Sequence, residues 1–176
     1  EHPLQSFVDP AGRVLLDVPY LPQTELLCGG AALAMVLRHW GERALVEEFA
    51  PLVDEDAGGI ADAVLVAAVE RRGWGAVRLP GTMSALAESL GRGEPPILLI
   101  EDRPGFFHYV VLVGMESNAV LLHDPTWGPG RRVEQETFLE QWRKSRNWAL
   151  AVLPPEQVES ERGIAPAHAA HSATIA

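Results

Sequence analysis

The sequence predicts a single α+β domain in which helices come first and a mainly antiparallel sheet follows. In the first half, apolar residues recur at helical spacing, whereas the second half contains short runs of bulky and β-branched apolar residues. The 176 residues are enough for one domain with a substantial core. Because the helices and strands are segregated along the chain, we do not expect a doubly wound parallel sheet.

The first predicted helix spans residues 29–40, where the apolar side chains follow a helical period and Gly41 supplies a C-terminal stop. A later helix is expected to begin after Thr82, whose hydroxyl can cap it. This later helix is predicted over residues 83–90, and two more helices of the first half are predicted over residues 45–52 and 60–72.

Apolar runs in the second half predict strands. The runs at residues 97–101, 107–115 and 119–124 consist largely of β-branched or bulky apolar residues. A short helix over residues 137–144 and a last strand over residues 148–153 complete the domain.

The two ends of the chain differ from the domain in pattern. Residues 1–16 are predicted to form an N-terminal arm, and residues 17–153 the domain itself. Residues 154–176 are rich in Glu, Pro, Ala and Ser without periodicity, so we expect a flexible C-terminal tail.

The composition limits the partners. With 14 basic and 24 acidic residues the formal net charge is −10, which argues against nucleic acid or an anionic membrane surface. No apolar run is long enough to cross a bilayer. The single cysteine excludes an internal disulfide framework. A peptide or protein substrate fits these limits.

The cellular location stays open. Because the chain begins at Glu1, both a cytoplasmic location and export after removal of a signal peptide are compatible with the sequence.

The one cysteine, Cys28, stands where a proline-rich segment passes into the first predicted helix. Unpaired N–H groups and the helix dipole favour negative charge at a helix start, so we expect a lowered pKa for this thiol and a role as nucleophile. The alternative is a small buried apolar residue. A nearby base, and a group that orients it, would decide between the two.

The hairpin formed by the second and third predicted strands offers both groups. If its loop has three residues, Gly114 pairs with Asn118, and His108 lies directly opposite Asp124. Opposed residues of antiparallel strands share a face, with Cβ atoms about 4.5–5.5 Å apart. A five-residue loop keeps this pairing, whereas a loop of two or four residues puts the two side chains on opposite faces.

The same parity puts His123 on the other face, where we expect it to pack or to reach solvent. Taken singly, His108 is typical of a core histidine, and Asp124 of a turn that starts at an Asp-Pro pair. Their joint occurrence with Cys28 favours a catalytic set. A metal site built from these four residues is the alternative, but it lacks the closely spaced ligand pairs of most metal sites, so we expect neither metal nor cofactor.

Four further side chains complete the candidate site. Gln23 stands just upstream of Cys28, where its amide can join the Cys28 backbone N–H in binding an oxyanion. Phe107 and Trp127, together with Phe106, neighbour the histidine and the aspartate in sequence. They are expected to wall a substrate groove, with plain core packing as the alternative.

Four stretches of the sequence carry a family resemblance, and they read VPYLPQTELLCGGAALAMVLRHWG, FFHYVVLVG, LLHDPTWG and FLEQWRKSRNWALAV. Over residues 17–153 the chain resembles the bacterial papain-like cysteine peptidases of the bacteriocin-processing, double-glycine leader family, including their stand-alone members. The resemblance implies Gln23 as oxyanion donor, Cys28 as nucleophile, His108 as general base and acid, and Asp124 as the group that orients His108.

The sequence also differs from the family pattern. Leu27 and Gly30 occupy positions where many members have an acidic residue and a non-glycine residue, and Gln23 stands five residues before the cysteine. Neither membrane spans nor a G-x-x-x-x-G-K-S/T motif are present in these residues, and a separate transporter or partner protein stays open.

The expected activity is hydrolysis of peptide bonds through a thioester, and the resemblance implies cleavage after small residues such as Gly-Gly in a leader or other peptide. Two alternatives share the fold: a non-catalytic peptide-binding module, and an acyl or amide transferase that uses the same thioester.

Overall fold

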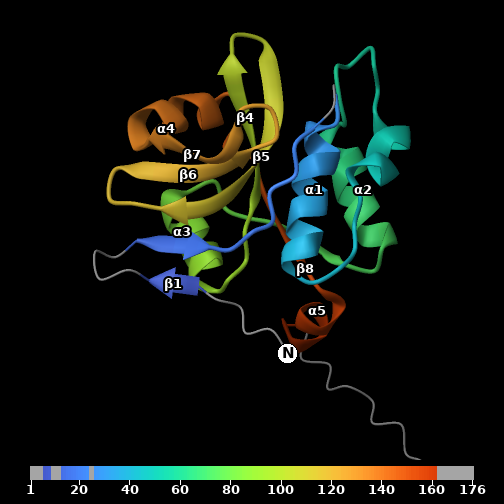
Figure 1. The fold of residues 1–176 in the computed structure, drawn as a ribbon, viewed down its shortest axis with the longest axis horizontal. Helices are drawn as coiled ribbons and strands as arrows, with labels where there is room; N and C mark the ends of the chain where they lie inside the picture. The colour runs from blue at the N-terminus through green and yellow to red at the C-terminus, as the bar shows by residue number, and fades with distance from the viewer. Residues whose placement is uncertain (1–5, 9–12, 24–25, 162–176) are drawn as a thin grey trace, which may run out of the picture.

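The structure is a computed structural model that describes residues 6–8, 13–23 and 26–161. A helical layer lies beside an eight-stranded sheet (Figure 1). In chain order the elements are β1 (Ser6–Val8), β2 (Val14–Leu16), α1 (Cys28–His39), the 3₁₀ helix η1 (Val46–Leu52), α2 (Asp62–Arg71), β3 (Gly75–Arg78), α3 (Met83–Gly91), β4 (Ile97–Arg103), β5 (Phe106–Met115), β6 (Ala119–Asp124), β7 (Gly128–Glu134), α4 (Gln135–Arg143), β8 (Ala149–Leu153) and α5 (Pro155–Glu161).

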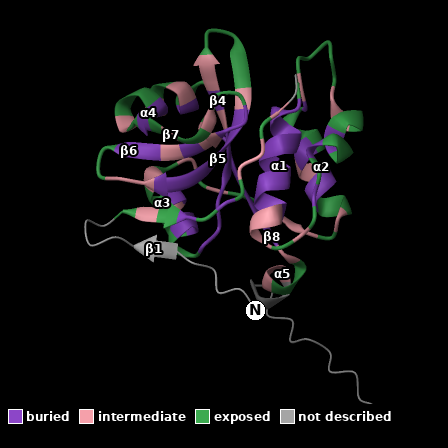
Figure 2. Cartoon of the chain, in the orientation of Figure 1, coloured by how far each residue is buried: buried purple, intermediate pink, exposed green. Residues whose placement is uncertain are grey.

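Helix α1 forms the centre of the molecule. Residues 31–37 have no exposed surface, and the helix is coloured as buried for most of its length in Figure 2. It packs against β5 of the sheet on one side and against η1 on the other. A helix that is apolar on all sides can be buried in this way, which fixes the position of its first residue, Cys28, at the junction of the two layers.

All the strand pairs are antiparallel, and β5 is the strand that connects most of the sheet, since it pairs with β2, β4 and β6. Helix α4 packs against the sheet and contributes two fully buried aromatic side chains, Phe138 and Trp142, whose rings are stacked with centroids 5.3 Å apart.

The predicted α+β class is confirmed. Every predicted helix and strand overlaps an observed one, although 45–52 is a 3₁₀ helix, and Thr82 caps α3 by accepting a hydrogen bond from the Ala85 N–H at 3.2 Å.

Four of the described strands were not predicted: β1 and β2 lie within the predicted arm, and β3 and β7 lie within the domain. Strand β7 has the sequence GPGRRVE, whose proline and glycines are typical of turns. In the described sheet β7 pairs with β6 alone, and an edge strand tolerates proline because one side of its backbone needs no partner.

The predicted arm and tail need correction where the structure describes them. Residues 14–15 of the arm pair with β5, so the end of the arm is part of the sheet. Residues 155–161 of the tail form helix α5, while residues 162–176 lie outside the described part. None of the helices in the described part combines the length and apolar composition of a membrane span.

Two helical glycines give a matched test of the packing around α1. A Cβ atom on Gly30 would lie 2.8 Å from the Cβ of Phe49, whereas one on Gly91, at the end of α3, meets nothing within 4 Å. Alanine is the better helix former at both positions. We expect Gly91→Ala to raise the free energy of unfolding by about 0.5 kcal/mol and Gly30→Ala to lower it by about 1–3 kcal/mol, because the overlap forces a backbone shift. Urea denaturation measures both, and equal effects would contradict the close packing at Gly30.

Candidate active site

Cys28 is the first residue of α1 and is 7% exposed. The preceding turn brings Leu26 into the left-handed region with φ of 65°, an unusual backbone conformation for leucine. Among the described residues no side chain caps the helix start, where Leu27 is the N-cap. The first N–H groups of α1 are therefore available to negative charge beside the thiol.

Burial raises the pKa of the Cys28 thiol, and this effect outweighs the backbone N–H groups of Tyr109 and Gly29, which act in the opposite direction. The negative charge of Asp124 adds to the rise. The prediction of a lowered thiol pKa is therefore wrong for the unliganded chain. The helix start does favour the thiolate, but desolvation of a buried sulfur is the larger effect.

The β5–β6 hairpin differs from the prediction at its loop. Gly114 pairs with Leu121 rather than with Asn118, and Glu116 N donates to Ala119 O across a two-residue turn. Such a loop alone would put His108 and Asp124 on opposite faces. The register shifts by one residue between Leu112 and Gly114, however, and this β-bulge restores the parity.

Beyond the bulge, Val111 pairs with His123, so His108 and Asp124 share a face but are offset diagonally rather than directly opposed. The His108 Nε2 lies 3.0 Å from Asp124 Oδ2. An ionised carboxylate can only accept, so Nε2 carries the hydrogen, and the other nitrogen of the neutral ring, Nδ1, is left with a free lone pair.

Asp124 is fully buried and accepts hydrogen bonds on both oxygens. Oδ2 accepts from His108 and, at 2.9 Å, from Arg131 Nη1, while Oδ1 accepts from the backbone N–H groups of Thr126 at 3.0 Å and Trp127 at 3.2 Å. Burial on its own raises the pKa of Asp124, but the interactions with His108, the Thr126 N–H and Arg131 outweigh it, so the pKa is lowered. The carboxylate therefore stays ionised.

Arg131 and Asp102 extend this network, and neither was predicted from the sequence. Arg131 Nη2 lies 3.4 Å from Asp102 Oδ1, and the Trp127 Nε1 donates to Asp102 Oδ2 at 3.0 Å. Arg131 lies on β7, which was not predicted as a strand because its glycines and proline are typical of turns. Asp102 lies where a bulge interrupts the β4–β5 pairing. Arg131 could have been predicted only if β7 had been recognised as the strand that pairs with β6.

Gln23 lies near the other members of the set. Its Nε2 donates to Thr126 Oγ1 at 2.7 Å. A hollow of about 170 Å³ is lined by Gln23, Cys28 and His108 together, so residues from three distant parts of the sequence share one space. The structure thus brings together the three side chains that the sequence predicted, with Asp124 behind His108.

His123 lies on the other face of the sheet, as predicted. Its Nε2 donates to Val18 O at 2.8 Å, and its Nδ1 accepts from the Gly130 N–H at 3.0 Å. Both ring nitrogens are occupied, and burial lowers the pKa of His123. It therefore belongs to the packing and cannot join a metal site with Cys28.

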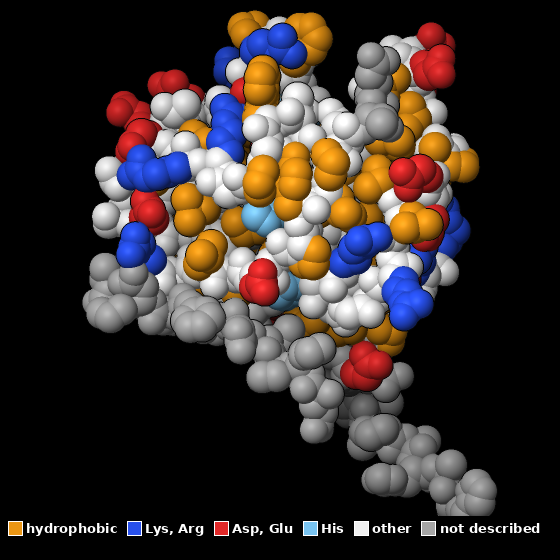
Figure 3. All heavy atoms as spheres, in the orientation of Figure 1, with side chains coloured by type: hydrophobic (Ala, Val, Ile, Leu, Met, Phe, Trp, Pro, Cys, Tyr) orange, Lys and Arg blue, Asp and Glu red, His pale blue; other side chains and the backbone are white. Residues whose placement is uncertain are grey.

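The aromatic side chains beside the site are exposed rather than part of the core. Phe106, Phe107 and Trp127 are 61%, 45% and 57% exposed and line the hollow that contains Gln23, Cys28 and His108. This finding contradicts the alternative of plain core packing. Apolar side chains also gather at the centre of the face shown in Figure 3, beside a histidine side chain.

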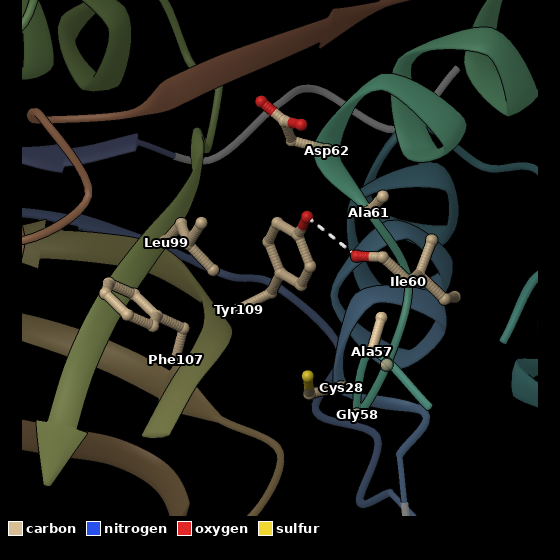
Figure 4. Close-up of a pocket in the computed structure, with 10 residues that line it drawn as sticks. Cys28, Ala57, Gly58, Ile60, Ala61, Asp62, Leu99, Phe107 and Tyr109 are labelled. Carbon is tan, nitrogen blue, oxygen red and sulfur yellow. Dashed lines mark hydrogen bonds between the residues drawn. The ribbon is translucent and has the colours of Figure 1, made fainter. Parts of the chain in front are cut away.

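A second hollow of about 170 Å³ also reaches Cys28 (Figure 4). Phe107 and Leu99 form its wall on the sheet side, and residues 57–62 form the opposite wall. The Tyr109 hydroxyl donates to Ile60 O at 2.9 Å, which ties the two walls together. The two hollows share Cys28, Gly58 and Phe107 as lining residues.

The helical half of the chain carries the thiol, and the sheet half carries the imidazole and the carboxylate. This arrangement is that of the papain-like cysteine peptidases. The chain belongs to the Peptidase C39 family, whose model matches residues 18–153. It is therefore a papain-like cysteine peptidase, and the predicted family is confirmed.

Individual relatives agree with this assignment. The chain is 32% identical over 145 residues to the colicin V secretion/processing ATP-binding protein CvaB of Escherichia coli, covering 82% of this chain but 19% of that protein. Among solved structures, the peptidase domain of Streptococcus ComA has a TM-score of 0.67 at 22% identity, covering 78% of this chain and 99% of that domain. A double glycine motif protease from an AMS/PCAT transporter, solved with its leader peptide, has a TM-score of 0.62 at 24% identity, covering 78% and 92%.

The buried carboxylate predicts a pH-dependent stability. Because the folded-state pKa of Asp124 is lowered, its stabilising contribution is complete above the unfolded-state pKa of about 3.9 and is lost as the pH falls through the folded-state pKa. We expect Asp124→Asn to lower the free energy of unfolding by about 1–3 kcal/mol near neutral pH. The difference from the wild type should shrink below about pH 4.

Urea denaturation at several pH values measures this difference. The exposed Asp56 offers a matched control, since Asp56→Asn should change the unfolding free energy by less than about 0.5 kcal/mol. A difference between Asp124→Asn and wild type that stays constant from neutral to acidic pH would contradict an ionised, stabilising Asp124.

Proposed function

We propose that the chain hydrolyses a peptide bond after small residues such as Gly-Gly, in a leader or other peptide, with Cys28 as nucleophile. The observation that carries the proposal is the His108–Asp124 hydrogen bond of 3.0 Å, on a histidine that lines the same hollow as Cys28 and Gln23. A buried apolar cysteine would need neither an oriented imidazole nor a neighbouring amide.

In this mechanism the thiol is protonated at rest, because burial raises its pKa. The Nδ1 of His108 takes the proton as the Cys28 sulfur attacks the carbonyl carbon, and the oxyanion that forms accepts hydrogen bonds from the Cys28 N–H and the Gln23 amide. The carbon–nitrogen bond then breaks, and the imidazolium gives its proton to the departing amine. Water, deprotonated by His108, hydrolyses the thioester and releases the thiol.

Asp124 orients the imidazole and stabilises the imidazolium, and it stays ionised throughout because its pKa is lowered. Among the described residues no side chain caps the start of α1, which supports the role of the Cys28 N–H, since a cap would compete with the oxyanion for the first-turn donors.

The preference for small residues rests on the dimensions of the site. Each hollow at Cys28 encloses about 170 Å³, below the roughly 300–1,000 Å³ typical of small-molecule sites. Phe107 borders both hollows, and the hydrogen bond between Tyr109 and Ile60 restricts how far the walls of one of them can separate. A bulky side chain before the cleaved bond would collide with these walls.

The comparisons support a peptide substrate. The solved double glycine motif protease holds a leader peptide, and CvaB is named as a secretion and processing protein. A separate transporter or other partner protein that delivers the peptide is part of the proposal. Exposed Phe107 and Trp127 offer apolar contacts to the substrate beside the thiol.

The catalytic assignment predicts the behaviour of two variants. Cys28→Ala should abolish hydrolysis of a Gly-Gly-containing peptide library, and His108→Ala should lower kcat by about 10²–10⁴-fold, because general base catalysis is lost. His123→Gln is the matched histidine control and should retain activity, since His123 lies on the other face of the sheet. Mass spectrometry of the products measures cleavage. Turnover that survives in Cys28→Ala would overturn the assignment, and binding without turnover in the wild type would favour a binding module.

The small hollows at Cys28 predict a steep preference for a small residue before the cleaved bond. Replacing that glycine by leucine in an otherwise identical peptide should lower kcat/KM by at least about 10²-fold, which corresponds to roughly 3 kcal/mol of steric repulsion. Phe107→Ala enlarges both hollows and should recover part of the loss for the leucine peptide. Equal cleavage of the two peptides by the wild type would show that the walls do not select for size.

A further inference from the structure

Gln23 is held at two points by the turn that follows Asp124. Its backbone N–H donates to Pro125 O at 3.2 Å, and its side-chain Nε2 donates to Thr126 Oγ1 at 2.7 Å. The amide oxygen Oε1 is buried and has no hydrogen-bond partner among the described residues. The Thr126 hydroxyl is therefore the one hydrogen-bonding group in the described part that fixes the rotation of this amide.

The Gln23 amide thus has one bonded end and, within the described part of the chain, one buried end without a partner. Nearly all buried polar atoms in proteins are paired, so an exception calls for a cause. The bond to Thr126 is the observed constraint on this amide, and it holds the Nε2 end at the hollow that Cys28 and His108 also line. Only one of the two Nε2 hydrogens is used by Thr126, and the other is free to donate.

Thr126 is itself held by Asp124, whose Oδ1 accepts the Thr126 N–H at 3.0 Å while Oδ2 accepts from His108. One carboxylate thus orients the imidazole directly and presents the threonine hydroxyl to Gln23. The His108 imidazole and the Gln23 amide are therefore connected through this turn.

We infer that Thr126 is a positioning residue, whose hydroxyl holds the Gln23 amide so that its free N–H can stabilise the oxyanion. The inference rests on the proposed function, because it takes Gln23 as an oxyanion donor. A preorganised donor stabilises the transition state more than the bound substrate, so Thr126 acts on kcat. Valine has the shape of threonine but no hydroxyl, which makes Thr126→Val the informative change.

We expect Thr126→Val to lower kcat about tenfold on a Gly-Gly peptide, with KM within twofold of the wild type, and Thr126→Ser to restore kcat. Thr82→Val is the matched control: it also removes one threonine hydrogen bond, the cap of α3, but leaves kcat unchanged because Thr82 lies outside the site. A kcat for Thr126→Val equal to that of the wild type would overturn the inference.

A second comparison isolates the route through Gln23. Gln23→Ala should lower kcat about 10²-fold or more, as loss of an oxyanion donor does, and adding Thr126→Val to it should have no further effect. An additional tenfold loss in the double variant would show that Thr126 acts through another group.

A measurement independent of catalysis separates this inference from the proposed function. In ¹⁵N-labelled protein, the Gln23 side-chain NH₂ signal, assigned by its absence in Gln23→Ala, should have a high heteronuclear NOE in the wild type and Thr126→Ser and a low one in Thr126→Val. An equally rigid amide in Thr126→Val would overturn the positioning role. If no variant or wild type cleaves any peptide, the proposed function fails, while the NMR result still decides whether Thr126 holds Gln23.

Discussion

The structure of the site depends on one buried carboxylate. Asp124 is fully buried, and its two oxygens accept hydrogen bonds from His108, Arg131 and two backbone N–H groups of the following turn. Such a group is stable inside a protein only if it is paired and hydrogen-bonded. These partners lie on β5, β7 and the β6–β7 turn, so pairing this one charge also fixes three segments of the sheet half relative to each other.

The thiol belongs to the other half, and its chemistry follows from where α1 is buried. The helix start directs backbone N–H groups at Cys28, yet burial among apolar neighbours raises the thiol pKa. A protonated, shielded sulfur that is deprotonated only when the imidazole takes its proton is less exposed to adventitious oxidation than a permanent thiolate. The Tyr109 hydroxyl bonded to Ile60 O joins the halves beside this sulfur, so the residue after His108 also keeps the two walls in place.

Much of the fold could be predicted because local periodicity reports burial. The apolar pattern of α1 and the runs that became β4, β5, β6 and β8 follow directly from which side chains need to leave water. The strands β3 and β7 could not be predicted in this way, since edge strands bury little and β7 contains turn-forming residues. Arg131 was missed for the same reason. The β5–β6 loop was predicted with the wrong length, and a bulge that local sequence does not reveal brought His108 and Asp124 back to one face.

By itself, the sequence determined which chemical groups are available and roughly where they stand: a cysteine at a helix start, a histidine and an aspartate on one hairpin, and a glutamine upstream. These properties depend on residue type and short-range periodicity, which are local. Only the tertiary structure decided the direction of the thiol pKa, the diagonal contact between His108 and Asp124, and the hold of Thr126 on Gln23. Desolvation, register after a bulge and contacts between residues about a hundred positions apart depend on the whole fold, because each is set by what the rest of the chain places nearby.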